Sequence, residues 1–284
     1  MIIKKKSYKE MTAEQAARQF IKEGRLYIFV LSFEIVWMIC LDLYVIRYGV
    51  HDTLYKLFCG LMFMTILLML IHKRVILGRF VGIMINHCDL EKFLTAYDYV
   101  AQKNIFSEDL KMIRSWYSVS LIYCADYNTA KRSLLSEIQE TKKKWMKVNA
   151  KANLAVLHYM YGENEEFEKL YNEIMWAINT TSLKRFPKYV KDVHSALDAR
   201  RMVLVGNYDG AAEFYRKRIE NAENRKSIFH SVINSIQLGD IELIRGNKAE
   251  ALVAYGYAIQ RAPQMTYVQS RIPKYEELKK EFSK

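Results

Sequence analysis

The sequence contains few residues that form turns or cross-links. Its 284 residues include 11 Gly, three Pro and four Cys. An all-β sandwich needs a turn about every 8 to 12 residues, so this small supply of Gly and Pro favours helices joined by short loops. The four cysteines form no CxxC pair and have no spacing with histidine that is typical of a disulfide framework or a zinc site. We therefore expect an all-α protein without a metal site.

Charge is scarce in one part of the chain. The chain carries 43 Lys and Arg and 31 Asp and Glu, for a net charge of +12, yet only five of these residues lie within 26–72. Two apolar runs occupy this part, residues 26–46 and 53–71. A helix of about 20 residues crosses a hydrocarbon core of about 30 Å. Because a short loop joins the two runs, the sequence predicts a hairpin of two transmembrane helices.

The first apolar run does not have the features of a cleavable signal peptide. A polar tail of 25 residues precedes it, and no small-x-small cleavage pattern follows it. A buried hairpin in a soluble helical protein stays open as the alternative to a membrane hairpin. The predicted organisation is therefore a basic arm (1–25), a two-span hairpin (26–72) and a helical domain (73–284).

The distribution of Lys and Arg predicts the orientation of the hairpin. Seven basic residues precede the first span, whereas the connection holds Arg47, with Lys56 just inside the second span. Lys73, Arg74 and Arg79 follow the second span. Because cytoplasmic flanks of membrane spans are enriched in Lys and Arg, we expect a multi-pass protein of the cell (plasma) membrane with both termini in the cytoplasm.

The arm before the first span has the pattern of a helix. Thr12 and Gln15 have the spacing of a capping box, and Gly24 is expected to end this helix before the span begins. Its basic residues could contact anionic lipid headgroups, or could act only as a topology signal. The lipid bilayer is in either case an expected partner.

Three ionisable residues lie within the apolar runs. Asp42 and Lys56 lie near the same end of the hairpin and could form an internal ion pair. Glu34 lies near the middle of the first span, where an unpaired carboxylate costs on the order of 3 kcal/mol. It could be protonated without a role, join copies of the chain into a homo-oligomer, bind a partner span, or belong to an ion or proton pathway.

The remainder of the chain contains a repeated pattern. Turn residues followed by an amphipathic helix recur at Cys88, Ala125, Gly162, Gly206 and Gly246, at intervals of about 40 residues. The second helix of a helix pair is expected to begin directly after each of these positions. Because such a pair is apolar on two sides, it must stack on its neighbours. The pattern predicts an α-solenoid that ends in a polar capping helix after Pro263, interrupted by Pro273.

One stretch carries a more specific pattern. Residues 238–263 read LGDIELIRGNKAEALVAYGYAIQRAP and resemble a tetratricopeptide repeat (TPR). The matching positions are Leu238, Gly239, Gly246, Ala251, Tyr255, Ala258 and Pro263. Ser235 and Glu242 depart from the pattern, where the family has Trp and Tyr. The resemblance reaches back to Lys151 with fewer matches, and core packing accounts for most of the tyrosines and alanines.

The TPR resemblance implies a groove for a protein partner. In this family the first helix of each pair lines a concave surface that receives a peptide or a helix. Transferred by position, the groove would present Asn153, Val156, Tyr159, Arg200 and Asp240. The chaperone-binding members hold a C-terminal carboxylate with Lys and Asn at set positions. Val156 and Arg200 occupy one such position here, so the resemblance does not imply that specificity.

The sequence carries no recognisable catalytic motif. Walker, HExxH, GxSxG, GxGxxG and kinase signatures do not occur, and the six histidines are scattered. We predict no catalytic, cofactor-binding or metal-binding residues. Two short runs of basic and aromatic residues, 141–147 and 184–191, are interpreted as solvated helix ends, so nucleic-acid binding is not expected.

These features together predict a membrane-tethered adaptor that binds an unidentified protein through a TPR-like groove. The alternative is an accessory subunit of an integral membrane transport or secretion complex, assembled through its spans. An enzyme of unrecognised type is the third hypothesis.

Overall fold

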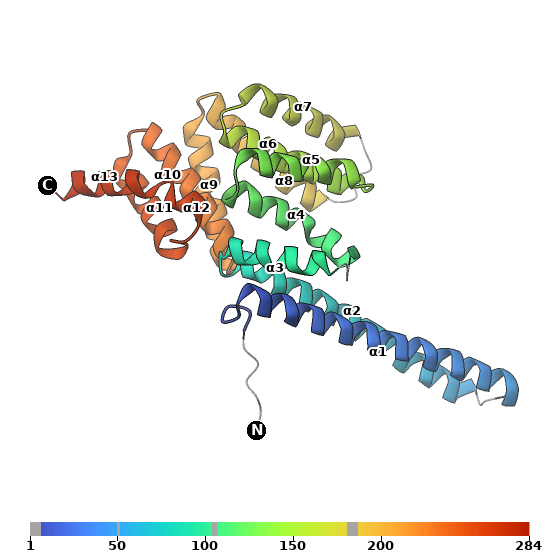
Figure 1. The fold of residues 1–284 in the computed structure, drawn as a ribbon. Coiled ribbons are helices and arrows are strands. Elements are labelled where there is room, and N and C mark those ends of the chain that lie inside the picture. The colour runs from blue at the N-terminus through green and yellow to red at the C-terminus, as the bar shows by residue number, and fades with distance from the viewer. Residues whose placement is uncertain (1–6, 50–51, 104–106, 181–186, 284) are drawn as a thin grey trace. The chain divides into compact units, whose positions relative to one another are not determined.

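The computed structural model describes residues 7–49, 52–103, 107–180 and 187–283. Within these ranges the regular structure consists of helices, without a strand, which confirms the predicted all-α class (Figure 1). The chain divides into two compact units. Residues up to Gly82 form the first unit together with Thr95–Leu110, and Ile83–Leu94 form the second together with the chain from Lys111 onwards.

The first unit contains two long helices, α1 (Ala13–Tyr48) and α2 (Asp52–Ile85). Helix α1 begins as predicted: the backbone N–H of Gln15 donates to Thr12 Oγ1, and that of Thr12 donates to Gln15 Oε1, both at 3.2 Å. The expected break at Gly24 is wrong, because α1 continues through it. A helical glycine costs only about 1 kcal/mol, and packing of Phe20 against Phe80, with ring centroids 4.5 Å apart, holds the turn before it.

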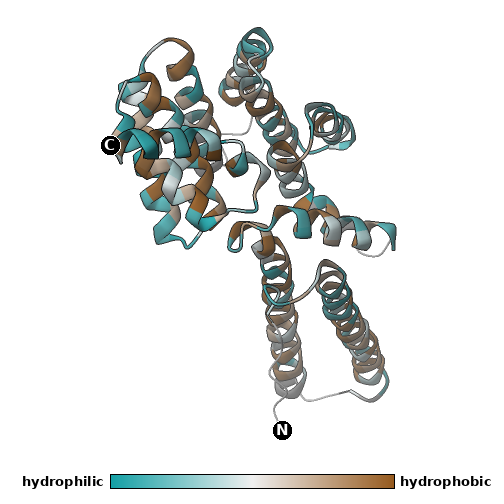
Figure 2. Cartoon of the chain, turned by 60° about the vertical axis from the view of Figure 1, so that its left-hand side comes forward, coloured by the Kyte–Doolittle hydropathy of each residue, from teal (hydrophilic) through white to brown (hydrophobic). Residues whose placement is uncertain are grey.

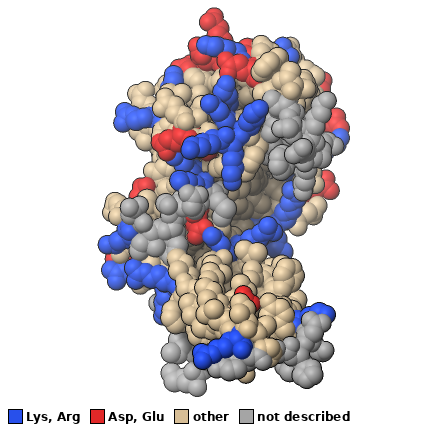
Figure 3. Space-filling model, turned by 90° about the vertical axis from the view of Figure 1, so that its right-hand side faces the viewer, with Lys and Arg blue, Asp and Glu red and all other residues tan. Residues whose placement is uncertain are grey.

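The apolar parts of both helices face outwards. In the most apolar 18-residue stretch of α1, 0% of the residues are buried, and in that of α2 17% of the residues are buried. Phe29, Phe33 and Phe63 are 69%, 62% and 67% exposed. Hydrophobic residues colour long stretches of these helices in Figure 2, and the end of the hairpin that faces the viewer in Figure 3 is mostly uncharged. Both helices are long and apolar enough to cross a membrane, and the predicted spans, 26–46 and 53–71, lie within them.

The chain beyond α2 is a series of helices. Their bounds are α3 Leu90–Gln102, α4 Ser107–Cys124, α5 Tyr127–Glu140, α6 Lys144–Met160, α7 Asn164–Thr180, α8 Pro187–Leu204, α9 Tyr208–Asn224, α10 Ile228–Ile244, α11 Lys248–Arg261, α12 Thr266–Gln269 and α13 Ile272–Phe282. Helices of successive pairs pack on one another, most extensively α9 with α10 and α10 with α11. This arrangement confirms the helical repeats.

The five predicted turn positions all lie between the two helices of a pair. Gly162, Gly206 and Gly246 have φ of 75°, 81° and 81°, and Cys88 has φ of 53°. These positive values lie in the left-handed region that glycine adopts without steric cost. After Ala125, the side chain of Asp126 caps α5 by accepting a hydrogen bond from the Thr129 backbone N–H at 3.0 Å.

Alanine, glycine and tyrosine bring the repeat helices close together. Tyr255 of α11 is fully buried, and its ring lies against Gly239 of α10, where an added Cβ would approach to 2.6 Å. Ala251 and Ala258 are also fully buried on α11. Side chains of this pattern therefore pack in the core.

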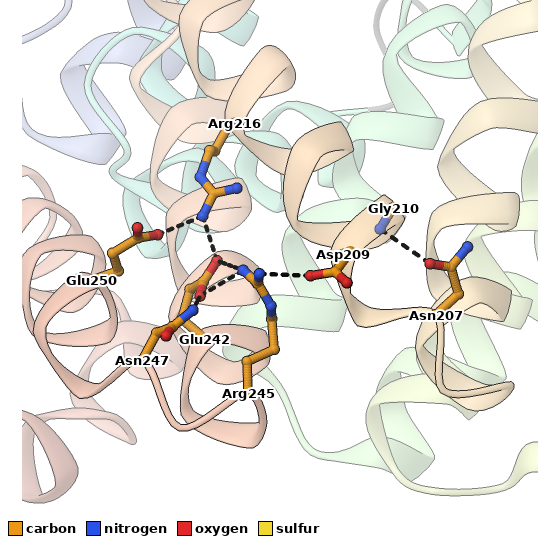
Figure 4. Close-up of polar contacts among 8 residues, drawn as sticks. All are labelled: Asn207, Asp209, Gly210, Arg216, Glu242, Arg245, Asn247 and Glu250. Carbon is orange, nitrogen blue, oxygen red and sulfur yellow. Dashed lines mark hydrogen bonds and ion pairs between the residues drawn. The ribbon is translucent and has the colours of Figure 1, made fainter.

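A polar network joins α9, α10 and α11 (Figure 4). At its centre is Glu242, which is fully buried. Its carboxylate accepts hydrogen bonds from Arg216 at 2.6 Å, Arg245 at 2.8 Å and Asn247 at 2.7 Å. Arg216 also pairs with Glu250. Two arginines and an amide therefore satisfy the buried carboxylate.

The ends of the second unit meet through side chains. Tyr123 of α4 contacts the rings of Phe229 and Tyr267, with centroids 5.6 Å and 5.2 Å away. Gln264 Nε2 donates to the carbonyl of Cys88 at 3.2 Å, although the two residues are far apart in sequence. The repeats of this unit therefore curve until early and late helices touch.

The segment after Pro263 differs from the single capping helix that the sequence predicts. It forms two helices, α12 and α13, and Pro273 lies in the first turn of α13 instead of interrupting a helix. Proline is well suited to a first turn, because no intrahelical partner is lost there. Met265 and Val268 are buried, so this segment also contributes to the core.

Candidate binding cavity in the second unit

The second unit contains a cavity of about 280 Å³. Side chains from α4, α6, α8, α9 and α10 line it, and these include three asparagines, Asn149, Asn153 and Asn234. Apolar and aromatic side chains make up much of the remaining wall. A space of this size lies at the lower end of small-ligand pockets, so it accommodates one or two side chains or a compact molecule.

Four of the five residues predicted for the groove lie together. Asn153, Val156 and Arg200 line the cavity, and the guanidinium carbon of Arg200 lies 5.9 Å from the ring centroid of Tyr159. Asp240 does not line the cavity: it forms an ion pair with Arg271, whose Nη2 is 2.8 Å from Asp240 Oδ2. Asp240 also accepts a hydrogen bond from the Tyr255 hydroxyl at 2.6 Å.

Arg200 is a buried cation within this cavity. The residue is 8% exposed, and its Nη1 donates to the carbonyl of Ala196 at 2.7 Å. Its Nε is buried without a hydrogen-bond partner among the described residues. Within the described residues Arg200 is surrounded by four neutral phenols, those of Tyr123, Tyr159, Tyr215 and Tyr267, and no ion pair joins it to a carboxylate. Because a guanidinium stays charged at physiological pH, the positive charge is not neutralised by its own surroundings.

Two further polar atoms of the cavity wall have no partner. Asn153 Nδ2 and the Tyr215 hydroxyl are both buried without a hydrogen bond to the described residues. Burial raises the pKa of Tyr215, so the phenol stays neutral and retains its proton. Three donors from α6, α8 and α9 are therefore available in one cavity.

The other ionisable groups of the cavity wall balance one another. Arg218 Nη1 lies 3.8 Å from Asp192 Oδ1. Burial, together with Arg218 and Arg225, lowers the pKa of His230 to about 4. His230 therefore carries no charge near pH 7, and its Nδ1 lies 2.6 Å from the Ser227 hydroxyl. The net charge of the wall is accordingly that of Arg200.

Several cavity residues are not predicted by the sequence patterns. Trp116, Arg218, His230 and Asn234 come from α4, α9 and α10, and none of them belongs to a motif or to the expected groove positions. Trp116 packs edge-on against His230, with ring centroids 5.9 Å apart. Only the curvature of the repeats brings these residues together, and no local sequence signal reports that curvature.

The predicted intramembrane residues lie on the apolar helices. The Oε2 atom of Glu34 is buried and has no hydrogen-bond partner in the described ranges. Asp42 Oδ1 accepts a hydrogen bond from the Tyr55 hydroxyl at 3.0 Å, and Lys56 is the next residue along α2. The two helices are thus joined at this end by a phenol and a carboxylate.

Basic side chains gather in a second hollow, in the first unit. Arg18, Lys22 and Arg25 of α1, Tyr99 of α3 and Lys103 directly after α3 line a space of about 440 Å³. The arginines and lysines of α1 lie directly before the apolar part of that helix. Lys4, Lys5 and Lys6 of the predicted basic arm, and residues 184–186 of the second basic run, lie outside the described residues.

Within the described residues, no group of three or more His, Cys, Asp or Glu is placed to hold a metal ion.

Comparison with known proteins finds no relative: neither a family model, nor a curated protein, nor a solved structure matches the chain.

Proposed function

We propose that this chain is a membrane-anchored adaptor that captures a protein partner in the cavity of its second unit. The observation that carries the proposal is the combination of outward-facing apolar helices with a helical-repeat unit that holds a cavity lined by Arg200 and three asparagines. Tethering acts by raising the local concentration of the partner at the membrane, without requiring new contacts. The TPR resemblance of residues 151–263 supports a protein as the partner.

The apolar surface supports the anchor. Soluble monomers rarely expose contiguous apolar patches larger than a few hundred Å². Helix α1 instead has an apolar window with 0% of its residues buried, and Ile46 is 81% exposed. A bilayer would cover this surface. The excess of Lys and Arg before the first span supports cytoplasmic termini, and the hollow lined by Arg18, Lys22 and Arg25 would then face anionic headgroups.

Photo-crosslinking in native cells tests the adaptor, because tryptophans lie at suitable places. A photoreactive phenylalanine replaces Trp116 in the cavity or, as the matched control, Trp176, which is 69% exposed on α7. An adaptor gives a discrete protein adduct at position 116 and none at position 176. If position 116 gives no adduct in correctly inserted protein, the adaptor proposal is wrong.

A specific observation also favours the accessory-subunit alternative. The partnerless Glu34 Oε2 needs a donor, and a partner span or a second copy of this chain could supply one. The photoreactive residue at Trp37, one turn from Glu34, should then give an adduct that disappears in Glu34→Leu. Asp42→Asn serves as the control in the same helix. Unchanged adducts in Glu34→Leu would remove the role assigned to this carboxylate.

A further inference from the structure

We infer that the cavity of the second unit recognises one acidic side chain, an Asp or Glu, of its protein partner, with Arg200 as the group that pairs with it. This inference rests on the proposed function, since it names the chemistry by which the cavity would select a partner. It depends on three properties of the cavity: an unneutralised buried charge, a set of unpartnered donors and a small volume.

The buried charge is the first property. Removing a guanidinium from water costs several kcal/mol unless an anion and hydrogen bonds replace the lost hydration. Arg200 is 8% exposed, and its hydrogen bonds within the described chain go to neutral groups, the carbonyl of Ala196 and the hydroxyl of Tyr123. The neighbouring ring of Tyr159 provides a weak cation–π contact at 5.9 Å but no negative charge. An anion that enters the cavity would supply the missing charge.

The unpartnered donors are the second property. Arg200 Nε and Asn153 Nδ2 can only donate hydrogen bonds, and the neutral Tyr215 hydroxyl can donate one. Buried donors are normally satisfied in folded proteins, by water where the chain supplies no acceptor, so these three donors can be offered to a bound acceptor. A carboxylate has two oxygens and about four acceptor sites, which suits this set of donors.

Charge and volume together favour a carboxylate over a phosphate. Arg218 is neutralised by Asp192, at 3.8 Å, and His230 is uncharged near pH 7, so the wall carries one net positive charge. A phosphate monoester carries nearly two negative charges, which this single positive charge does not balance. The volume of about 280 Å³, bordered by Val156, Leu197 and Ile233, accommodates a short carboxylate side chain and little more of a polypeptide.

Acetate is the simplest probe of this site. The full-length protein in detergent micelles is unfolded by heat at pH 7 with added sodium acetate, acetamide or sodium phosphate, at one ionic strength maintained with sodium chloride. At several times its dissociation constant, acetate should raise the Tm by about 2–4 °C, whereas neutral acetamide should not. An equal effect of acetate and acetamide overturns the inference without any variant.

Variants assign the effect to Arg200. Arg200→Met keeps most of the side-chain volume but removes the charge, so the acetate shift should disappear. Its Tm without acetate should be no lower than that of the unchanged protein, because an unpaired buried charge has been removed. Arg201→Met is the matched control: Arg201 is the neighbouring residue, 46% exposed and paired with Glu168, and its loss should leave the acetate shift intact.

The remaining outcomes are also decisive. A larger shift with phosphate than with acetate, lost in Arg200→Met, would assign the site to a phosphorylated group and overturn the carboxylate. An unchanged acetate shift in Arg200→Met would place the anion elsewhere. If acetate has no effect but position 116 still crosslinks to a protein, the acidic recognition is wrong and the adaptor stands. If acetate binds through Arg200 but position 116 gives no adduct, the adaptor is wrong.

Discussion

The carboxylate of Glu242 lies 2.6 Å from Nη2 of Arg216, and this ion pair joins two successive helix pairs of the second unit. Glu242 is fully buried, whereas Arg216 is 44% exposed and reaches over it from α9. Arg245 and Asn247 supply further donors to the same carboxylate. The bonds from Arg245 and Asn247 are local to the turn after α10, whereas Arg216 comes from α9 and also pairs with Glu250 of α11. The network around this buried carboxylate therefore favours one alignment of the three helices.

Glu242→Gln should therefore destabilise the protein more than the loss of an exposed ion pair. The amide removes the buried anion that Arg216 and Arg245 share and leaves them only their exposed partners Glu250 and Asp209, so we expect a loss of about 2 kcal/mol in the free energy of unfolding. The control is Glu213→Gln, which removes an exposed pair with Lys217 and should cost less than about 0.5 kcal/mol. Urea denaturation followed by far-UV circular dichroism measures both variants. Equal midpoints for the two would contradict the role given to Glu242.

The close approach of α10 and α11 gives a second prediction. Gly239→Ala places a Cβ 2.6 Å from the buried ring of Tyr255, which has little room to move, so we expect a loss of about 1–3 kcal/mol. Gly78→Ala in α2 is the control, since its Cβ meets nothing within 4 Å. This control should be neutral or stabilising by up to about 1 kcal/mol. A tolerated Gly239→Ala would show that the helices can separate here.

Much of the helical architecture could be predicted from local sequence signals. The turn residues Gly162, Gly206 and Gly246 mark positions that need a positive φ, and their regular spacing shows how many helix pairs to expect. The break expected at Gly24 does not occur, because glycine weakens a helix by an amount that packing of neighbouring residues readily offsets. The sequence alone does not show that packing of the neighbouring residues outweighs the cost of a glycine in the helix.

The cavity was only partly predictable. The repeat pattern placed Asn153, Val156 and Arg200 on one surface, and they do line one cavity. Asp240 fits the same pattern, yet it pairs with Arg271, which belongs to the segment after the last repeat. Trp116 and His230 meet because α4 and α10 approach each other through the curvature of the whole unit. Contacts of this kind depend on small angles accumulated over several helix pairs, and no single repeat contains them.

The pKa of His230 predicts how stability depends on pH. Burial lowers this pKa from 6.5 to about 4, so between these values the unfolded chain binds more protons than the folded one. The stability is complete above pH 6.5 and falls as the pH drops towards 4. Between pH 7 and pH 5 the expected loss is about 2 kcal/mol.

His230→Gln tests this dependence, because the amide does not titrate and can still interact with Ser227. The variant should lose clearly less stability between pH 7 and pH 5 than the unchanged protein does, as measured by urea midpoints at both values. Carboxylates with a lowered pKa, such as Glu140 at about 2 beside Arg114, lose their contribution mainly below pH 4.5 and scarcely affect this window. Parallel pH profiles for the two proteins would refute the assignment to His230.

The membrane orientation can be mapped with the native cysteines left in place. Burial raises the pKa of Cys88 and Cys124 to about 12, which keeps both thiols protonated and slow to react, and Cys40 and Cys59 lie within the apolar helices. A membrane-impermeant maleimide should therefore label the unchanged protein weakly. Ser7→Cys and Ser283→Cys introduce exposed thiols before α1 and after α13, whereas Gly49→Cys introduces one between α1 and α2.

With both termini in the cytoplasm, Gly49→Cys should be labelled in intact cells, while Ser7→Cys and Ser283→Cys should be labelled only after permeabilisation. More Lys and Arg precede the first span and follow the second span than lie in the loop between them, and basic flanks are retained on the cytoplasmic side. Labelling of both terminal positions in intact cells, without labelling of Gly49→Cys, would show the opposite orientation. Labelling of all three positions in intact cells would contradict a two-span anchor.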